Sequence, residues 1–138
     1  MSEMREILFR GKDLQEQNGW LYGYFYKSDI NKRERESGKA TLIFTPNCDT
    51  FIYCPEYHNS WMVKAETVGQ YTGLKDKNGL TKVFEYDIID ANGRKVGNYY
   101  ENSDLLKDGT CFLVARMGTK EWSRSEQEAI KRGCKYAE

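Results

Sequence analysis

Residues 66–89 read ETVGQYTGLKDKNGLTKVFEYDII, and this segment has the pattern of a β-hairpin. Its outer parts, 68–72 and 81–89, are rich in β-branched and aromatic side chains, which favour a pleated, half-buried surface. The residues between them are turn formers, and the Asn78-Gly79 pair supplies the positive φ that a tight hairpin turn requires. We therefore predict two antiparallel strands that meet at this turn.

Runs of the same kind lie on both sides of this hairpin. The most aromatic is WLYGYFY at 20–26, which follows an Asn18-Gly19 turn signal. Gly23 inside this run indicates a bulge or a close backbone contact. CFLVARM at 111–117 is the most apolar run and has the composition of a buried strand. The remaining predicted strands are 5–10, 40–45, 50–53 and 96–100.

The segment from Ser123 to Tyr136 is the predicted C-terminal helix. Ser125 with Glu128 three residues later matches a capping box, which indicates a helix start at this point. The apolar stripe of this segment is thin, so we expect the helix to pack by one narrow face.

The length and composition of the chain suit one folded domain, residues 1–138. With 138 residues, of which 14% are aromatic, the chain can bury a core without disulfides or metal. Two lobes, 1–65 and 66–138, are the alternative. We expect a mainly β fold in which hairpins form a small, bent sheet, with one C-terminal helix.

Two blocks of the chain resemble the YopX family. The first, about 4–26, contains REILFRGK and NGWLYGY. The second, about 62–90, contains YTGLKDKNG and FEYDI, where the family typically reads YTGL-D-NG and then Y/F-E-G-D-I/V. The resemblance implies a small phage or prophage protein of a family without an established activity, and it contributes to the expectation of a partial SH3-like barrel. Tyr86 stands where the family usually has Gly, whose backbone freedom Tyr does not share.

The charges of the chain balance, with 21 Lys and Arg against 21 Asp and Glu. This balance gives no support for a nucleic-acid or anionic-membrane partner. The sequence holds no run near the roughly 18 apolar residues of a membrane span, and its acidic start is unlike a signal peptide. We therefore expect a cytoplasmic protein of a bacterial host cell whose four cysteines are thiols.

Few side chains have the spacing of a catalytic or metal site. Cys48, Cys54 and His58 lie close in sequence, but a zinc site needs a fourth ligand. Cys54 or Cys111 with His58 has the residue types of a nucleophile and its base, but no catalytic signature surrounds them. We predict no enzyme activity, no metal and no cofactor.

Glu85 and Asp87 have the i, i+2 spacing that places two side chains on one face of a strand. Such a pair is suited to binding a cation or to acid–base chemistry. The simpler interpretation, which we favour, is an exposed face opposite Phe84, Tyr86 and Ile88.

The YTGLKDKNG motif has two interpretations. In the first, Tyr71, Lys75, Asp76 and Lys77 present a recognition surface. In the second, the glycines adopt backbone conformations that other residues avoid, and the Asp and Asn side chains form hydrogen bonds with the backbone of the turn. We favour the second interpretation.

The aromatic strand at 20–26 provides the other candidate surface. Alternation along the strand places Leu21 and Phe25 on one face and Tyr22 and Tyr24 on the other. If the first face is core, the tyrosines are left for a lobe, a subunit or a partner. We predict a non-enzymatic protein that binds a host or phage protein, or a second copy in a homo-oligomer. The alternative is a nucleic-acid-binding module whose aromatic β surface stacks on bases.

Overall fold

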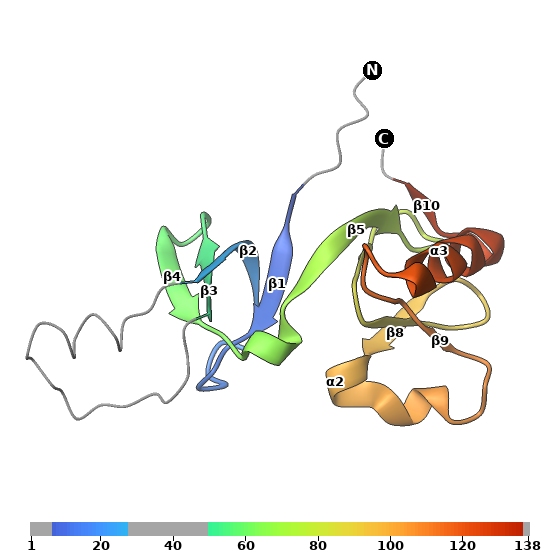
Figure 1. Ribbon diagram of the computed structural model, residues 1–138, viewed down its shortest axis with the longest axis horizontal. Coiled ribbons are helices and arrows are strands. Elements are labelled where there is room, and N and C mark those ends of the chain that lie inside the picture. The colour runs from blue at the N-terminus through green and yellow to red at the C-terminus, as the bar shows by residue number, and fades with distance from the viewer. Residues whose placement is uncertain (1–6, 28–49, 137–138) are drawn as a thin grey trace, which may run out of the picture. The chain divides into compact units, whose positions relative to one another are not determined.

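The computed structural model describes residues 7–27 and 50–136 of the chain (Figure 1). These residues form two compact units, one from Leu8 to Val68 and one from Gly69 onward, here called the N-terminal unit and the C-terminal unit. That residues 1–138 fold as a single domain stays a prediction. Predictions that lie outside the described residues concern the start of the strand at 5–10, the strand at 40–45, and Cys48.

The N-terminal unit is an antiparallel meander in which each strand pairs with the next along the chain. It confirms the aromatic strand predicted at 20–26 and shifts the first strand toward the C-terminus. Its elements are β1 (Phe9–Lys12), β2 (Trp20–Lys27), β3 (Thr50–Cys54), β4 (Asn59–Met62) and the 3₁₀ helix η1 (Ala65–Thr67).

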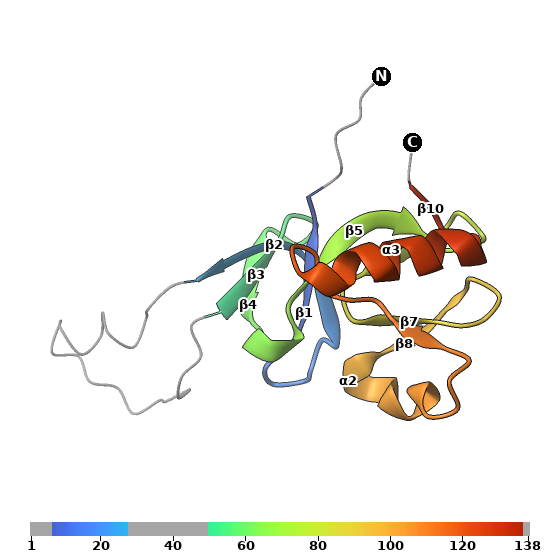
Figure 2. The same ribbon diagram turned by 45° about the vertical axis from the view of Figure 1, so that its right-hand side comes forward.

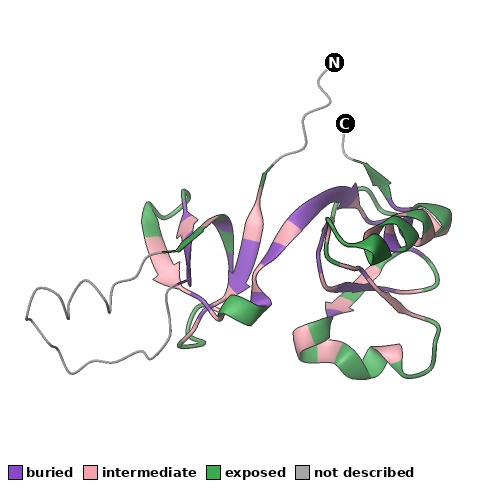
Figure 3. Ribbon diagram, in the orientation of Figure 1, coloured by how far each residue is buried: buried purple, intermediate pink, exposed green. Residues whose placement is uncertain are grey.

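One face of this meander carries the hydrophobic core of the N-terminal unit. The buried residues of the meander are the purple segments in Figure 3. Phe25 and Ile52 are directly opposite each other on β2 and β3. A Cβ at Gly23 would overlap the Tyr53 carbonyl oxygen, so this glycine lets the two strands approach, and the predicted close contact is confirmed. The buried cluster consists of Leu21, Ile52, Cys54 and Val63, with Phe9, Phe25, Trp61 and Val68 packed against it.

Two small antiparallel sheets and a helix form the C-terminal unit. In the first sheet, β5 (Gly69–Lys75) lies between β10 (Lys135–Tyr136) and β6 (Lys82–Phe84). In the second, β7 (Asp87–Ile89) lies between β8 (Lys95–Asn98) and β9 (Phe112–Leu113). The helices are α2 (Tyr99–Asn102), the 3₁₀ helix η2 (Ser103–Leu106) and α3 (Lys120–Arg132), which Figure 2 shows along its length.

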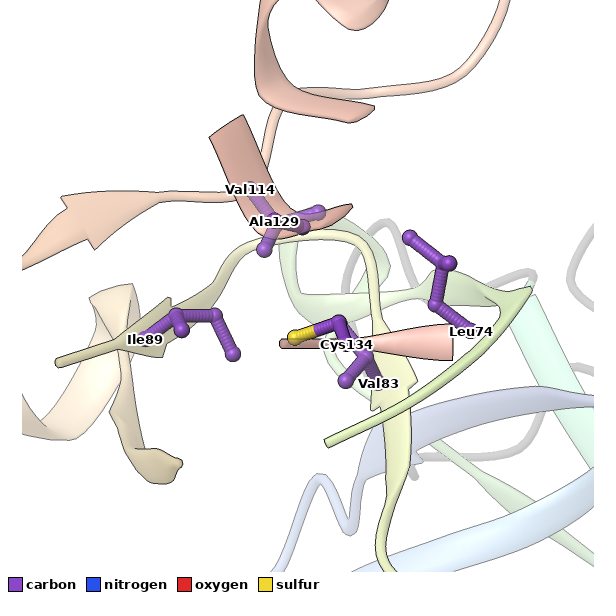
Figure 4. Packing of buried hydrophobic residues seen from close by; sticks show 6 residues of the cluster. All are labelled: Leu74, Val83, Ile89, Val114, Ala129 and Cys134. Atoms are coloured by element: carbon purple, nitrogen blue, oxygen red, sulfur yellow. The ribbon is translucent and has the colours of Figure 1, made fainter. Parts of the chain in front are cut away.

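A second core joins α3 to both sheets of the C-terminal unit (Figure 4). Ala129 brings α3 onto Ile89 of β7 and Val83 of β6, and all three side chains are buried. The full cluster is Leu74, Val83, Ile89, Val114, Ala129 and Cys134, with Phe112 and Trp122 at its border.

The hairpin predicted from residues 66–89 has its turn where the sequence indicates. Asp76 N–H donates to the Thr81 carbonyl at 2.9 Å, and Gly79 N–H donates to the Asp76 carbonyl at 2.8 Å. Gly79 has φ +75°. The Asp76 carboxylate also accepts the Asn78 N–H at 3.1 Å, as the structural interpretation of this motif requires.

The prediction of one continuous strand over residues 81–89 is wrong. The run divides into β6 and β7, because the backbone turns at Tyr86, which has φ +71°. This is the left-handed region that favours Gly. The position where the family usually has Gly is therefore a turn, and this chain keeps the turn with a tyrosine.

The helix predictions need two corrections. Helix α3 begins at Lys120 rather than at Ser123, and Ser125 is a buried residue within it, so the predicted capping box does not form. Tyr99 and Tyr100 are helical rather than extended. Asn98 caps the start of their helix, because its side chain accepts hydrogen bonds from Tyr100 N–H and Glu101 N–H.

Strands outweigh helices in the described residues, and α3 lies near the C-terminus, so the mainly β fold with one C-terminal helix is confirmed. The strands are antiparallel, as hairpins require. In neither unit do the described strands close into a barrel, so the sheets are open ones.

Candidate binding surface

Three tyrosines, Tyr22, Tyr24 and Tyr26, form an exposed row on β2, here called the tyrosine face. Their side chains are 44%, 52% and 40% exposed. Leu21, which points to the other face of β2, is only 5% exposed. The face of the strand that carries Leu21 is therefore core. This is the condition under which the sequence leaves the tyrosines for a lobe, a subunit or a partner.

The neighbouring strands continue the aromatic character of this face, because residues directly opposite each other in a sheet share a face. Tyr24 is opposite Tyr53, and Tyr26 is opposite Phe51. The Tyr26 and Phe51 rings stack, with centroids 5.2 Å apart and planes 11° from parallel. The aromatic side chains of this face thus extend from β2 to β3, where Tyr53 is half-buried and Phe51 is buried beneath Tyr26.

A pocket of about 380 Å³ opens where the tyrosine face meets the turn between β3 and β4. In that turn, Tyr57 N–H donates to the Cys54 carbonyl at 3.1 Å, which brings Tyr57 over Trp61. Residues 56–60 carry no motif that indicates a site, and Pro55 indicates only that the strand ends there. The pocket is lined by Asn18, Trp20, Leu21, Tyr22, Cys54, Glu56, Tyr57 and Trp61.

The side chains singled out in YTGLKDKNG do not form one surface. Tyr71 is 1% exposed and its ring packs against Phe84, with centroids 5.6 Å apart. Asp76 is 4% exposed and is bonded within the turn. Burial keeps both from presenting a recognition surface, so for these two residues that interpretation is corrected. Lys75 is half-buried, and Lys77 is exposed.

Glu85 and Asp87 are buried, which corrects the expectation of an exposed carboxylate face. Glu85 Oε1 accepts Gln70 N–H, and its Oε2 accepts Met117 N–H, each at 2.9 Å. Asp87 Oδ2 accepts Phe84 N–H at 2.6 Å. These carboxylates hold backbone segments together on either side of the Tyr86 turn.

Two of the cysteines, Cys54 and Cys134, are buried core residues with free thiols, and Cys111 is half-buried. Burial raises the pKa of the Cys54 thiol above its usual value, and burial likewise raises the pKa of Cys134 to about 11. His58 is exposed in the β3–β4 turn, with φ +52°. Within residues 7–27 and 50–136, no group of three or more potential metal-ligating side chains is found.

None of the helices in the described part of the chain is both long and apolar enough to cross a membrane.

Comparisons with other proteins identify a family. No curated protein and no solved structure matches the chain. The family model described as YopX protein matches residues 8–96, which include β1 to β7 and the start of β8. This match covers more than half of the 138 residues, most of the first block recognised in the sequence and all of the second. The chain belongs to the YopX family.

Proposed function

We propose that this protein is a non-enzymatic binding module, encoded by a phage or prophage, that acts in the cytoplasm of a bacterial cell. Its partner is a host or phage protein, or a second copy of the chain. The observation that carries this proposal is the tyrosine face, three exposed tyrosines in a row on a strand whose opposite side is core.

The physical chemistry of this face suits protein recognition. Tyrosine offers a large apolar ring and a hydroxyl, and it loses little conformational entropy when it is covered, because it has few rotatable bonds. Strand β2 pairs with β1 and β3, so the rings are displayed from a fixed backbone. Aromatic residues of this kind are enriched at protein interfaces.

The titratable groups of the C-terminal unit support a non-enzymatic role. The carboxylates of Glu85, Asp87 and Asp76 accept backbone N–H groups, and the Cys134 thiol is buried in the core. Groups engaged in this way hold the fold together and are not directed toward a substrate. These contacts support a non-enzymatic role, and a screen of the purified protein for enzyme activity is an independent test of that role.

The double variant Tyr22→Ser/Tyr24→Ser tests the proposal, with Tyr99→Ser as the matched control. Tyr99 is 48% exposed and lies in the C-terminal unit. The double variant is expected to stay folded, with a denaturant midpoint changed no more than surface substitutions usually change it. It is also expected to lose a partner that the wild type captures, or to change its oligomer size in ultracentrifugation. The control is expected to keep both.

Two results would refute the proposal. If the double variant unfolds, the tyrosine face belongs to the core of the protein. If instead the wild type shifts single-stranded nucleic acid in a gel, with a strong salt dependence, and the double variant does not, the face stacks on bases and the nucleic-acid alternative is correct.

A further inference from the structure

The pocket beside the tyrosine face has the composition of a site for a positive charge. Four of its lining residues are aromatic, Trp20, Tyr22, Tyr57 and Trp61. The faces of such rings are negative and attract cations. Its one charged lining residue is Glu56, an exposed carboxylate that makes no ion pair within the described part of the chain.

The ring geometry of the pocket fits a flat cation. The Tyr57 and Trp61 rings are 5.7 Å apart and nearly perpendicular, at 89°, so they form two walls of a corner. On the same sheet the protein already places a guanidinium against an indole, since Arg10 Cζ lies 4.7 Å from the centre of the Trp20 ring. Arg10 itself does not line the pocket, and Glu56 is the charged residue that does.

We propose that this pocket binds an arginine side chain of a partner protein. The inference rests on the proposed protein-binding function and adds the chemistry that the partner must carry. A guanidinium is planar, stacks on an aromatic ring and donates two parallel hydrogen bonds to one carboxylate, which here is Glu56. A volume of about 380 Å³ lies in the range of ligand pockets and accommodates one such side chain. The carboxylate and the ring faces oppose an anionic occupant.

A pair of small probes tests the charge requirement on the full-length protein. Nα-acetyl-arginine methylamide is titrated in NMR, and the citrulline analogue, which has the same shape without the charge, is the control. The indole N–H signals of Trp20 and Trp61 are expected to shift with the arginine probe, whereas Trp122 of the C-terminal unit is an internal reference. The citrulline probe is expected to bind about tenfold more weakly or worse.

The variant Glu56→Gln tests the carboxylate, with Glu66→Gln as a matched control on an exposed glutamate of the same unit. Glu56→Gln is expected to weaken arginine binding about tenfold, and Glu66→Gln is expected to leave it unchanged. Equal binding of citrulline, an unaffected Glu56→Gln variant, or an equal shift at Trp122 would each overturn the proposal. Equally tight binding of the lysine analogue would overturn the assignment to arginine.

Tyr24 separates this inference from the proposed function, because Tyr24 belongs to the tyrosine face but does not line the pocket. If Tyr24→Ser loses the partner while the wild type fails to bind the arginine probe, the pocket assignment is wrong and the binding function stands. If the wild type binds the probe but the variants of the tyrosine face lose no partner and keep their oligomer size, the pocket is correct and the proposed function fails.

Discussion

Asp87 Oδ2 lies 3.1 Å from Lys95 Nζ, across the paired strands β7 and β8, and the Asp87 side chain is fully buried. The same oxygen accepts the Phe84 N–H. Replacing a buried carboxylate leaves its cation without compensation and a backbone N–H without an acceptor. We expect Asp87→Ala to destabilise the protein by about 3 kcal/mol or more in denaturant unfolding.

The exposed pair of Lys64 and Glu16 is the control for this prediction, because Glu16 is largely in solvent. Glu16→Ala is expected to leave the free energy of unfolding nearly unchanged, because solvent screens an exposed ion pair. A similar small effect for Asp87→Ala would show that the buried pair does not hold β7 in place.

Tyr86 provides the second prediction, from its φ of +71°. A side chain with a Cβ is strained in this region by about 1–2 kcal/mol relative to glycine. We therefore expect Tyr86→Gly to be more stable than Tyr86→Ala by about 1 kcal/mol, which reverses the order usual in strands and helices. Both variants lose the ring contact with Tyr100, so that contact cancels in the comparison. The measurement is a pair of denaturant melts, and the usual order, with Ala the more stable, would show that the turn does not need this conformation.

How far the sequence predicts this fold depends on the range of the interactions involved. Alternation along β2 and the Asn78-Gly79 turn are local patterns, and both are read correctly from neighbouring residues. The break at Tyr86 is not local, because the Glu85 side chain beside it accepts hydrogen bonds from two distant backbone groups, Gln70 N–H and Met117 N–H. The alternation of side chains along residues 81–89 continues through this turn, so the local pattern does not indicate where the strand breaks.

The candidate site shows the same division. Strand alternation places Tyr22 and Tyr24 opposite Leu21, so their exposure follows once Leu21 is known to be core. The pocket depends on Trp20 of β2 and Trp61 of β4, which are far apart in sequence and lie on strands with β3 between them, and no local pattern contains such a relationship. Tyr71 is aromatic and polar, so its type alone did not tell a core position from a surface one.

Ser125 provides the third prediction, because its buried hydroxyl joins α3 to the chain before it. Ser125 Oγ accepts Ala115 N–H at 3.0 Å and donates to the Leu113 carbonyl at 3.4 Å. We expect Ser125→Ala to cost about 1–2 kcal/mol of unfolding free energy, because the Ala115 N–H loses its acceptor. Ser123→Ala, at an exposed position of the same helix, is expected to be neutral or slightly stabilising. Equal effects of the two substitutions would contradict the role of the hydroxyl.

Cys134 provides the last prediction, which concerns pH. Its thiol is 1% exposed and donates to the Gly93 carbonyl. Burial in the core, and next the nearby Asp76 carboxylate, raise its pKa from 9.0 to about 11. Folding therefore favours the protonated thiol, and the unfolded chain releases this proton at a lower pH than the folded protein does.

The sign of the effect on stability follows from this difference. Below pH 9 the thiol is protonated in both states, so its contribution is fully present, and it declines as the pH rises from about 9 toward 11. Other groups titrate in this range, so the measured quantity is the pH slope of the free energy of unfolding in the wild type minus that in Cys134→Ala. We expect Cys134→Ala to have the shallower decline. Identical slopes for wild type and Cys134→Ala would show that this thiol titrates alike in the folded and unfolded chains, and that its burial does not favour the protonated form.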